Sequence, residues 1–367
     1  MRVFFSTGEA SGELEATLAA QAMRRIDPSI EIEGIGGERF TEAGIRRMWD
    51  TRGWAGMGPL EALSKIPKLL SIMLITAFRL RSDPRELIVL VDFGAFNLRL
   101  ARMLRRIGYR GPLAYYFPPG AWLDKPRQAA AVSAVAAPIT PFEHQRDFYQ
   151  SCGLEIAYFG HPLISAIEPR ITRTAAPAGG GTIALLPGSR RAELLRHGPV
   201  MLKCVQHLRA ARPALEVIIA ASDEEAQTTL RAQLKEFAVA ARIVRGAPAA
   251  LAHADAACVA SGTAVLEAAL CGVPAVAMYI LSPAQWRIAT RVYSGRFITL
   301  PNLLCDRAVV PERLQDEATP EQLARDLEAL LADPAAQLAA YAGLRERLGP
   351  ADALDRIAAH MLELARA

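Results

Sequence analysis

The chain has 367 residues, of which 51% are hydrophobic and 22% charged, and its formal net charge is +4. This length exceeds one typical core and indicates two domains, and the composition argues against disorder. So small a net charge gives no reason to expect nucleic acid as a partner. Five widely spaced cysteines without a CxxC motif are typical of reduced thiols rather than of disulfides or a zinc site.

The N-terminal sequence MRVFFSTGEASGE predicts a first strand followed by a Gly-containing turn, not a signal peptide. No stretch reaches the roughly 18 uncharged apolar residues that a membrane-spanning helix needs. The nearest is IPKLLSIMLITAFRL, residues 66–80, which is short and flanked by charge. It suits a membrane surface better than a membrane crossing.

Short apolar runs alternate with helical patterns along the first half of the chain. The expected strands are Val3–Ser6, Ile30–Ile35, Leu87–Asp92, Leu113–Phe117, Ala134–Ile139 and Ile156–Phe159. The expected helices between them include Ser11–Ile26, Pro59–Leu80, Asn97–Ile107 and Pro141–Cys152. Strands that alternate with helices indicate βαβ units and a parallel sheet covered on both faces.

The same pattern restarts after a Pro/Gly/Thr-rich linker at 168–181. The expected strands of the second half are Thr182–Leu186, Glu216–Ala220, Arg242–Val244, Ala256–Val259 and Ala275–Met278. The sequence therefore predicts two Rossmann-like, doubly wound α/β domains, 1–167 and 182–334, that face one cleft. The last residues, 335–367, are predicted to be helices that pack across domains or subunits.

Asp92 directly follows the apolar run Leu87–Val91. Ligands of parallel sheets bind at the carboxyl ends of strands, near the point where strand order reverses. Asp92 is therefore a candidate active-site carboxylate. A helix cap at a strand-to-helix turn is the alternative.

The first loop, STGEASGE, offers Glu9 as a second acidic candidate that points towards the cleft. A plain turn with Ser11 as the helix cap is the alternative interpretation. His161 lies at a strand end beside the linker, which makes it the best placed of the six histidines. A lone histidine is more often structural.

The stretch IALLPGSRRAELLRH is a candidate phosphate site. A strand ends, Pro187 and Gly188 turn the chain, Ser189 is placed to cap a helix, and Arg190 lies in its first turn. Unpaired N–H groups and a partial positive charge make a helix N-terminus attractive to anions. The alternative is a capped helix with solvated arginines.

A second such loop follows the strand at Ala256–Val259, where Ser261, Gly262 and Thr263 open a helix and Glu267 lies one turn later. Small residues let backbone N–H groups approach a phosphate, and a glutamate there can accept both hydroxyls of a ribose. The alternative is an ordinary βαβ turn. Two such loops favour a nucleoside-diphosphate site, although neither is a Walker loop or a GxGxxG motif.

Basic residues gather in and beside the apolar segment 59–85 at Lys65, Lys68, Arg79, Arg81 and Arg85. A basic rim around apolar surface fits a helix at an anionic membrane. A buried helix with one solvated face explains the pattern equally well.

Taken together, the motifs resemble the lipid-A-disaccharide synthase family over nearly the whole chain. They are GEASGE, GIGGERFTEAGI, GMGPLEALSKIPKLL, VDFGAFNLRLA, TPFEHQRDFYQSCGLEIAYFGHPL, LLPGSRRAEL, VASGTAVLEAALCGVP and ITLPNLLCDRAVVPERLQ. Their collinear order is more specific than any single motif.

The resemblance implies the two-domain GT-B architecture and a metal-independent, inverting glycosyl transfer without a cofactor. UDP-2,3-diacylglucosamine would be joined to 2,3-diacylglucosamine 1-phosphate, known as lipid X, to give the β-1,6-linked lipid A disaccharide 1-phosphate and UDP. The family is peripheral at the cytoplasmic face of the inner membrane. Its C-terminal helices are associated with a swapped dimer, which makes a homodimer a candidate assembly.

Matched by position, Asp92 corresponds to the family's candidate general base and Glu9 to its first-loop acid. The resemblance assigns a further set of residues to the UDP side: Gly188, Ser189, Arg190, Ser261, Gly262, Thr263, Glu267, Asn302 and Gln315. Ser11, Trp122 and His161 would lie on the acceptor side.

The chain departs from the family at two acceptor-side places. Gly94 and Ala95 stand where the family has a proline and a second carboxylate, and the loop 118–125 retains Trp122 but not its neighbours. Three alternatives therefore stay open. They are a different acceptor, a UDP-N-acetylglucosamine 2-epimerase-like activity, and a non-catalytic homologue that binds nucleotide or lipid.

Overall fold

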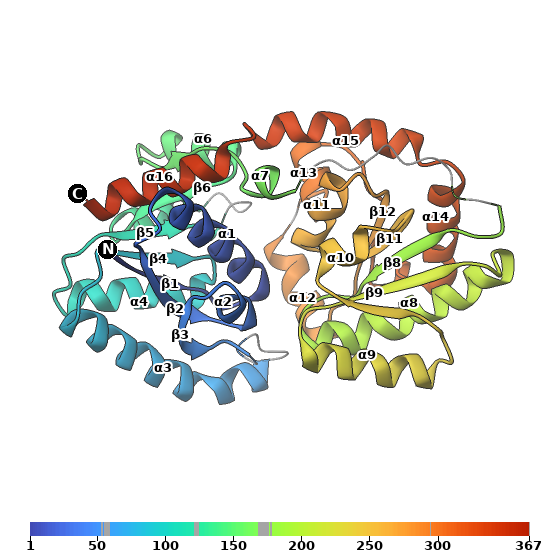
Figure 1. The fold of residues 1–367 in the computed structure, drawn as a ribbon, viewed down its shortest axis with the longest axis horizontal. Helices are drawn as coiled ribbons and strands as arrows, with labels where there is room; N and C mark the ends of the chain where they lie inside the picture. Colours follow the sequence, from blue (N-terminus) through green and yellow to red (C-terminus); the bar gives the residue numbers. More distant parts are fainter. Residues whose placement is uncertain are drawn as a thin grey trace. The chain divides into compact units, whose positions relative to one another are not determined.

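The computed structural model describes residues 1–52, 54, 59–120, 125–167, 176, 178–293 and 295–366. The chain divides into two compact units (Figure 1). Unit 1 comprises Met1–Ala166 with Leu348–Ala367, and unit 2 comprises Ile167–Arg347. Each unit is built around its own parallel sheet.

The sheet of unit 1 has the strand order β3-β2-β1-β4-β5-β6-β7 in the part of the chain that the structure describes, and neighbouring strands run parallel. Its strands are β1 Arg2–Ser6, β2 Glu31–Gly36, β3 Arg46–Asp50, β4 Leu87–Val91, β5 Leu113–Tyr116, β6 Ala137–Thr140 and β7 Ala157–Tyr158. Its helices are α1 Ala10–Ile26, α2 Glu38–Glu42, α3 Pro59–Ser82, α4 Gly94–Arg106, α5 Pro126–Ser133, α6 Glu143–Ser151, α7 Leu163–Ala166 and α16 Ala353–Arg366.

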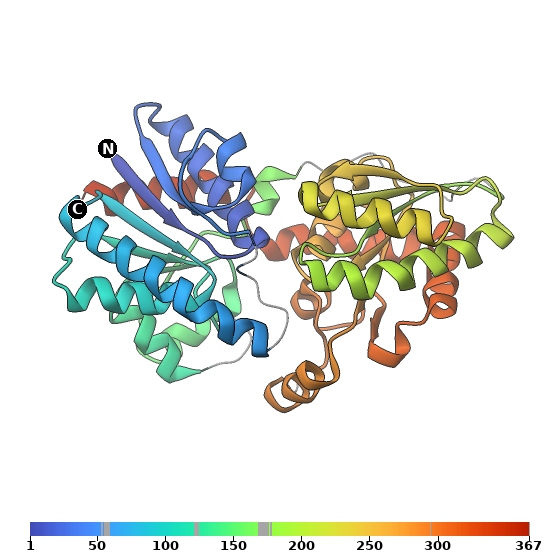
Figure 2. The ribbon, with the colours of Figure 1, turned by 90° about the horizontal axis from the view of Figure 1, so that it is seen from below.

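Alternate residues of the central strands pack against different helices. Val3 and Phe5 of β1 join a core with α1 and α16, whereas Phe4 joins a core with α3 and α4. This follows because successive side chains of a strand point to opposite faces. Figure 2 accordingly shows α3 and α16 on opposite faces of the sheet. The nearly continuous apolar sequence of β4 is what burial on both faces requires.

The described sheet of unit 2 has the order β10-β9-β8-β11-β12-β13 and is also parallel. Its strands are β8 Thr182–Leu186, β9 Glu216–Ala221, β10 Arg242–Arg245, β11 Ala256–Ala260, β12 Ala275–Tyr279 and β13 Glu312–Leu314. Its helices are α8 Arg191–Ala211, α9 Glu224–Glu236, α10 Ala247–Leu251, α11 Thr263–Leu270, α12 Pro283–Val292, α13 Leu300–Cys305, the 3₁₀ turn Gln315–Glu317, α14 Pro320–Ala332 and α15 Ala335–Leu348. Helices α8, α9 and α14 share one core with this sheet.

The end of the chain returns to unit 1. Helix α16 packs along α1 through Ile357 and Met361, both fully buried. Leu348 lies just before α16 in the chain, and its carbonyl oxygen accepts from the backbone N–H of His161 at 2.7 Å. Gly160 and Gly349 meet here with positive φ, and a Cβ on Gly349 would lie 2.7 Å from Gly160 Cα. Glycine is therefore required where these two segments cross.

Two edge strands were not predicted from the sequence. β3, with the sequence RRMWD, and β13, with ERL, are short, charged and poor in β-branched residues, so they lack the usual strand signal. The strand expected from Ala134 begins at Ala137 because Ala134 ends α5. Most of the predicted linker, 168–175 and 177, lies outside the described residues.

No helix among the described residues is both long enough and apolar enough to cross a membrane. α3 is the longest helix of unit 1.

Candidate functional site

The carboxyl ends of β1 and β4 lie side by side at the centre of the unit 1 sheet. The sheet continues from this pair through β2 on one side and β5 on the other, so strand order reverses here. Open parallel sheets bind their ligands at such a switch point. The loops that leave these two strands carry Glu9 and Asp92, so the two acidic candidates belong to one edge of one sheet.

Asp92 is half-buried and has a left-handed backbone conformation, with φ +47°, and Phe93 follows with φ +44°. A non-glycine residue in this region costs about 1 kcal/mol or more. Three hydrogen bonds hold the Asp92 backbone in place. Its N–H donates to Tyr116 O, and its carbonyl accepts from the Tyr115 hydroxyl and from Asn97 Nδ2, each at 3.0 Å.

Asn97 is the polar centre of this edge and was not identified from the sequence. Its buried side chain accepts from Ser6 Oγ at 2.7 Å and donates towards the carbonyls of Ser6, Val91 and Asp92, each at 3.0 Å. One amide thus ties the end of β1 to the end of β4. The signal available in the sequence was an asparagine in the first turn of the helix that follows the strand-end aspartate.

The residues of the first loop differ in their position at the start of α1 and in their burial. α1 begins at Ala10 with Glu9 at its N-cap, so the alternative interpretation, in which Ser11 caps this helix, is wrong, and Ser11 lies inside the first turn. Glu13 is buried, and its Oε1 accepts from Phe40 N at 3.1 Å at the start of α2. Burial raises the pKa of Glu13 against the opposing effect of such backbone donors. Glu9 is the more accessible acid of the two.

His161 is buried and packs against the rings of Phe117 and Phe142, with centroids 5.7 and 5.6 Å away. Its Nδ1 accepts from Leu163 N at 3.3 Å. Burial lowers the pKa of His161 to about 3, so the ring is neutral at pH 7. These surroundings are those of a structural histidine. Trp122, the other acceptor-side candidate, lies outside the described residues.

The unit 2 sheet has its own switch point between β8 and β11, because β9 and β12 lie to either side of this pair. The loops after β8 and β11 are the two stretches that the sequence singles out as phosphate candidates. The fold therefore brings both to adjacent strand ends.

The start of α8 is capped by its own glutamate. The expectation that Ser189 caps this helix is wrong, because Arg190 is the N-cap residue and Glu193 Oε2 accepts from the N–H groups of Ser189 and Arg190 at 3.0 and 3.2 Å. Gly188 has φ +111°, and a Cβ there would lie 2.3 Å from Glu193 Oε2. Only glycine allows this close return of the carboxylate.

Two further groups hold Glu193. Arg190 donates to its Oε1 at 2.7 Å, and the Tyr279 hydroxyl donates to the same oxygen at 2.8 Å. Burial raises the pKa of Glu193, but Arg190 and these hydrogen bonds outweigh burial and leave the pKa below its ordinary value. The carboxylate is thus ionised, and it holds the Arg190 guanidinium at the strand edge.

His197 joins two loops of this edge and was also missed by the sequence analysis. Its Nε2 accepts from Ile280 N at 3.1 Å, and its Nδ1 lies 2.8 Å from Pro187 O. A neutral ring with the proton on Nδ1 satisfies both contacts. Burial, the largest influence, lowers the pKa of His197. The ring therefore ties the loop after β8 to the loop after β12.

The start of α11 is open. The helix begins at Thr263 with Gly262 at its N-cap, and glycine has no side chain with which to cap it. Gly262 is exposed, with φ +154°, and an added Cβ would meet nothing within 4 Å. Ser261 is fixed by its N–H bond to Met278 O at 2.9 Å, and Glu267 is buried one turn along the helix. This end fits the approach of an anion.

Asn302 is buried and makes four hydrogen bonds within its own loop. Its Oδ1 accepts from Val309 N and Val310 N at 2.7 and 2.8 Å, and its Nδ2 donates to Val310 O and to Glu312 Oε1, both at 2.8 Å. This side chain shapes the segment around α13. Asn302, a candidate for the UDP side, therefore has a structural function in this fold.

Gln315 has φ +51° and reaches back to the loop after β12. Its Oε1 accepts from Leu281 N at 2.5 Å, and its Nε2 donates to Leu281 O at 3.3 Å. Both ends of the amide thus hold one backbone residue. Across the described part of the chain, no group of three His, Cys, Asp or Glu side chains is gathered as metal ligands would be.

Known proteins resemble this chain over nearly its whole length. The family model described as lipid-A-disaccharide synthetase matches residues 3–348. The lipid-A-disaccharide synthase of Myxococcus xanthus is 34% identical over 376 residues, covering 99% of this chain and 97% of the relative. That of Anaeromyxobacter dehalogenans strain 2CP-1 is 35% identical over 382 residues, covering 100% and 98%.

Solved structures with the same fold are much more distant in sequence. The UDP-GlcNAc 2-epimerase of Neisseria meningitidis bound to UDP-GlcNAc superposes with a TM-score of 0.64 at 12% identity, covering 99% of this chain and 100% of that one. The Methanocaldococcus jannaschii UDP-GlcNAc 2-epimerase gives 0.61 at 12% identity, with the same coverage. The predicted GT-B class of fold, with two parallel α/β sheets, is confirmed.

Replacing Asn97 with alanine should destabilise unit 1. The change removes the acceptor of Ser6 Oγ and the donor to two buried carbonyls and one half-buried carbonyl, which should cost roughly 2–4 kcal/mol. Urea unfolding measures the loss, and Gln150→Ala, at an exposed position of α6, serves as control. An Asn97→Ala midpoint equal to that of the control would refute the central role of this amide.

His161 should make the protein sensitive to mild acid. Its pKa is about 3 in the folded chain and 6.5 when unfolded, so its contribution to stability is complete above pH 6.5 and declines as pH falls towards 3. From about pH 7.5 to about pH 5, the wild type should lose about 2 kcal/mol more than His161→Asn. Urea unfolding at both pH values tests this, with exposed His253→Asn as control. Parallel pH curves for wild type and His161→Asn would contradict it.

Proposed function

The chain belongs to the lipid-A-disaccharide synthase family, and we propose that it joins UDP-2,3-diacylglucosamine to 2,3-diacylglucosamine 1-phosphate. The products are the β-1,6-linked lipid A disaccharide 1-phosphate and UDP. The protein is thus a glycosyltransferase that acts on a nucleotide sugar and a lipid acceptor.

The placement of Asp92 is the observation that carries the proposal. A half-buried carboxylate lies at a switch point, on a strained backbone that three hydrogen bonds hold in place. Strain of this kind persists only where the surrounding structure fixes it, and it gathers at functional sites. A helix cap alone gives no reason for this conformation.

We assign Asp92 the part of general base. The 6-hydroxyl of the acceptor has a pKa far above 7, so a carboxylate must take its proton as the new bond forms. The acceptor oxygen then attacks C1 of the donor sugar from the face opposite UDP. The bond between C1 and the phosphate oxygen breaks, UDP leaves with the electron pair, and the configuration at C1 inverts. Glu9, at the same sheet edge, would assist in orienting the acceptor.

The leaving UDP carries negative charge that the unit 2 loops can stabilise. The open start of α11 at Ser261–Thr263 offers backbone N–H groups, and Arg190 adds a guanidinium held by Glu193. Because Glu193 already occupies N–H groups at the start of α8, we place the diphosphate nearer α11 than α8. Glu267 is our candidate for the ribose hydroxyls.

We also propose that α3 attaches unit 1 to an anionic membrane. Of the eight large apolar side chains that are exposed among the described residues, five lie on this helix: Ile66, Leu70, Leu74, Ile75 and Phe78. Four of them are spaced four residues apart and form one stripe. Lys65, Lys68, Arg79 and Arg81 flank the stripe, as suits an interfacial helix.

This attachment supports a peripheral location at the cytoplasmic face of the inner membrane, where both acylated substrates would be met. A homodimer is compatible with the proposal, because α16 packs on α1 through one long apolar face. Exchange of α16 between two copies would preserve those contacts. Analytical ultracentrifugation determines the assembly.

Asp92→Asn should lower kcat roughly 10²- to 10⁴-fold, because the amide cannot accept the proton. UDP release from the acylated donor and acceptor measures turnover, and mass spectrometry identifies the disaccharide. Binding of UDP should be unchanged in Asp92→Asn, whereas Arg190→Gln should weaken it. Turnover near that of the wild type would eliminate Asp92 as the base.

Replacing Ile75 and Phe78 together with serine should weaken binding to vesicles of phosphatidylcholine and phosphatidylglycerol roughly tenfold, since two exposed apolar side chains would no longer enter the bilayer. Cosedimentation measures the affinity. Ile26→Ser, at another exposed apolar position of unit 1, is the control. Equal affinity for the double variant and the control would speak against α3 as the attachment helix.

A further inference from the structure

A cavity of about 350 Å³ lies at the edge of the unit 1 sheet opposite Asp92, where β1, β2 and β3 begin. Four arginines and two glutamates line it, together with Ile30, Ile32 and Gly44. The charged lining residues are Arg2, Arg24, Arg46, Arg85, Glu31 and Glu33. The reaction proposed above uses none of them.

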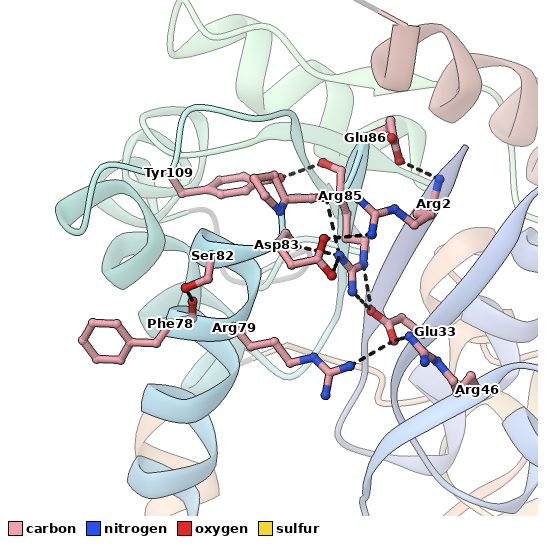
Figure 3. Close-up of polar contacts among 11 residues, drawn as sticks. Arg2, Glu33, Arg46, Phe78, Arg79, Ser82, Asp83, Arg85, Glu86 and Tyr109 are labelled. Carbon is pink, nitrogen blue, oxygen red and sulfur yellow. Dashed lines mark hydrogen bonds and ion pairs between the residues drawn. The ribbon is translucent and has the colours of Figure 1, made fainter.

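Glu33 is the charged centre of this cavity, and its side chain is only 6% exposed. Arg85 Nε donates to its Oε1 at 2.7 Å, Arg46 pairs with its Oε2, and Arg79 reaches to within 3.9 Å of that oxygen (Figure 3). Three guanidinium groups thus share one carboxylate. Asp83 also pairs with Arg85, so three guanidinium groups face two carboxylates, and the remaining positive charge favours a further anion.

Arg85 is the buried arginine of the cluster, and its contacts hold it in one position. Its side chain is 2% exposed and is fixed between Glu33 and Asp83, whose Oδ2 lies 2.7 Å from NH1. The Tyr109 hydroxyl also donates to Arg85 O at 3.0 Å. Burial alone would lower the pKa of Arg85, but its two carboxylate partners raise it, so the guanidinium keeps its charge.

The other arginines leave the cluster open to a ligand. The Arg46 side chain is 70% exposed beside its partner Glu33. That of Arg2 is 41% exposed and donates to Asp83 Oδ1 at 2.8 Å and to Pro84 O at 3.0 Å. Arg24 donates to Ala43 O at 2.7 Å and to Gly44 O at 3.0 Å, which anchors its far end. Two anchored and two solvent-facing guanidiniums suit a phosphate, whose oxygens accept paired N–H donors.

The end of α3 links this cavity to apolar surface. Figure 3 shows Arg79 pointing from α3 towards Glu33, while Phe78 points out from the other side of the helix. Phe78 is 57% exposed. An interfacial helix buries its apolar face roughly 5–10 Å deep, and a helix is about 10 Å across. When Phe78 enters the bilayer, the Arg79 side therefore lies at the level of lipid phosphates.

We propose that this cavity binds the phosphate of an anionic phospholipid headgroup. The proposal rests on the membrane attachment of α3 and adds a specific site to it. The cavity is at the small end of ligand pockets, so it suits a phosphate with a glycerol rather than a nucleotide sugar. Arg46 and Arg2 would donate hydrogen bonds to the headgroup phosphate, and the buried positive charge of Arg85 would attract it.

Cosedimentation of the full chain with two kinds of vesicle tests the site. One contains phosphatidylcholine alone, and the other equal parts of phosphatidylcholine and phosphatidylglycerol. Arg46→Gln should lower the affinity for the mixed vesicles about fivefold and leave that for phosphatidylcholine unchanged. Arg127→Gln removes the same charge from an exposed position on α5 and should have little effect on either.

Two measurements show whether a loss of vesicle binding arises at the headgroup site rather than from misfolding or from a change in catalysis. Urea unfolding of Arg46→Gln and of Arg2→Gln should show that both variants fold, and turnover on detergent-solubilised substrates should match the wild type. Equal losses for Arg46→Gln and Arg127→Gln on mixed vesicles would overturn the headgroup site while leaving membrane attachment standing. Failure of the wild type to bind either vesicle would instead refute the attachment itself.

Inorganic phosphate distinguishes a free anion from a lipid. If a lipid headgroup is the ligand, phosphate should reduce vesicle binding no more than sodium chloride of equal ionic strength does. If phosphate alone stabilises the wild type but not Arg46→Gln, and abolishes the difference between the two vesicles, the cavity is a site for free phosphate and the lipid proposal is wrong.

Discussion

The architecture of unit 1 depends on one buried amide. Asn97 Nδ2 lies 3.0 Å from three backbone carbonyls at the ends of β1 and β4, and Ser6 Oγ supplies its oxygen with a donor. Buried backbone carbonyls need a hydrogen-bond donor, and the Asn97 side chain supplies one to these three. In doing so, Asn97 fixes the turn at Asp92, and the strained aspartate becomes a consequence of how the sheet ends.

The departures from the family pattern beside Asp92 have a packing reason. A Cβ on Gly94 would lie 2.8 Å from Pro119 Cβ, so the small residue at 94 allows the loop after β5 to pass. Likewise a Cβ on Gly8 would lie 2.2 Å from the Phe93 ring. The backbone at the edge is thus packed closely around Asp92. Loss of the neighbouring carboxylate at Ala95, which is an exposed position, leaves this packing intact.

Sequence patterns located the edges of both sheets but not the side chains that complete them. The four loops that carry Glu9, Asp92, Arg190 and Ser261 were found because each follows an apolar run, which is a local signal. The partners of these loops are not local, since His197 meets Ile280 from 83 residues away and Ser6 meets Asn97 from 91 residues away. From the sequence alone, the starts of α8 and α11 are both predicted to be open to a phosphate. Only the structure shows that Glu193 closes the first, whereas the second stays open.

Substitutions at one edge of the unit 1 sheet should have little effect on the residues at the other edge. Its central strands have five residues, so the arginine cavity and Asp92 lie roughly 17 Å apart along the strand direction. The arginines there are paired with Glu33 and Asp83, and two unit charges at that distance interact by only about 1 kcal/mol at an effective dielectric constant of about 20. The charges around Glu33 therefore act only weakly on a proton at Asp92, and changes at the amino edge can alter the proposed membrane attachment without altering the proposed base. A parallel sheet separates the two tasks because its strands all point the same way.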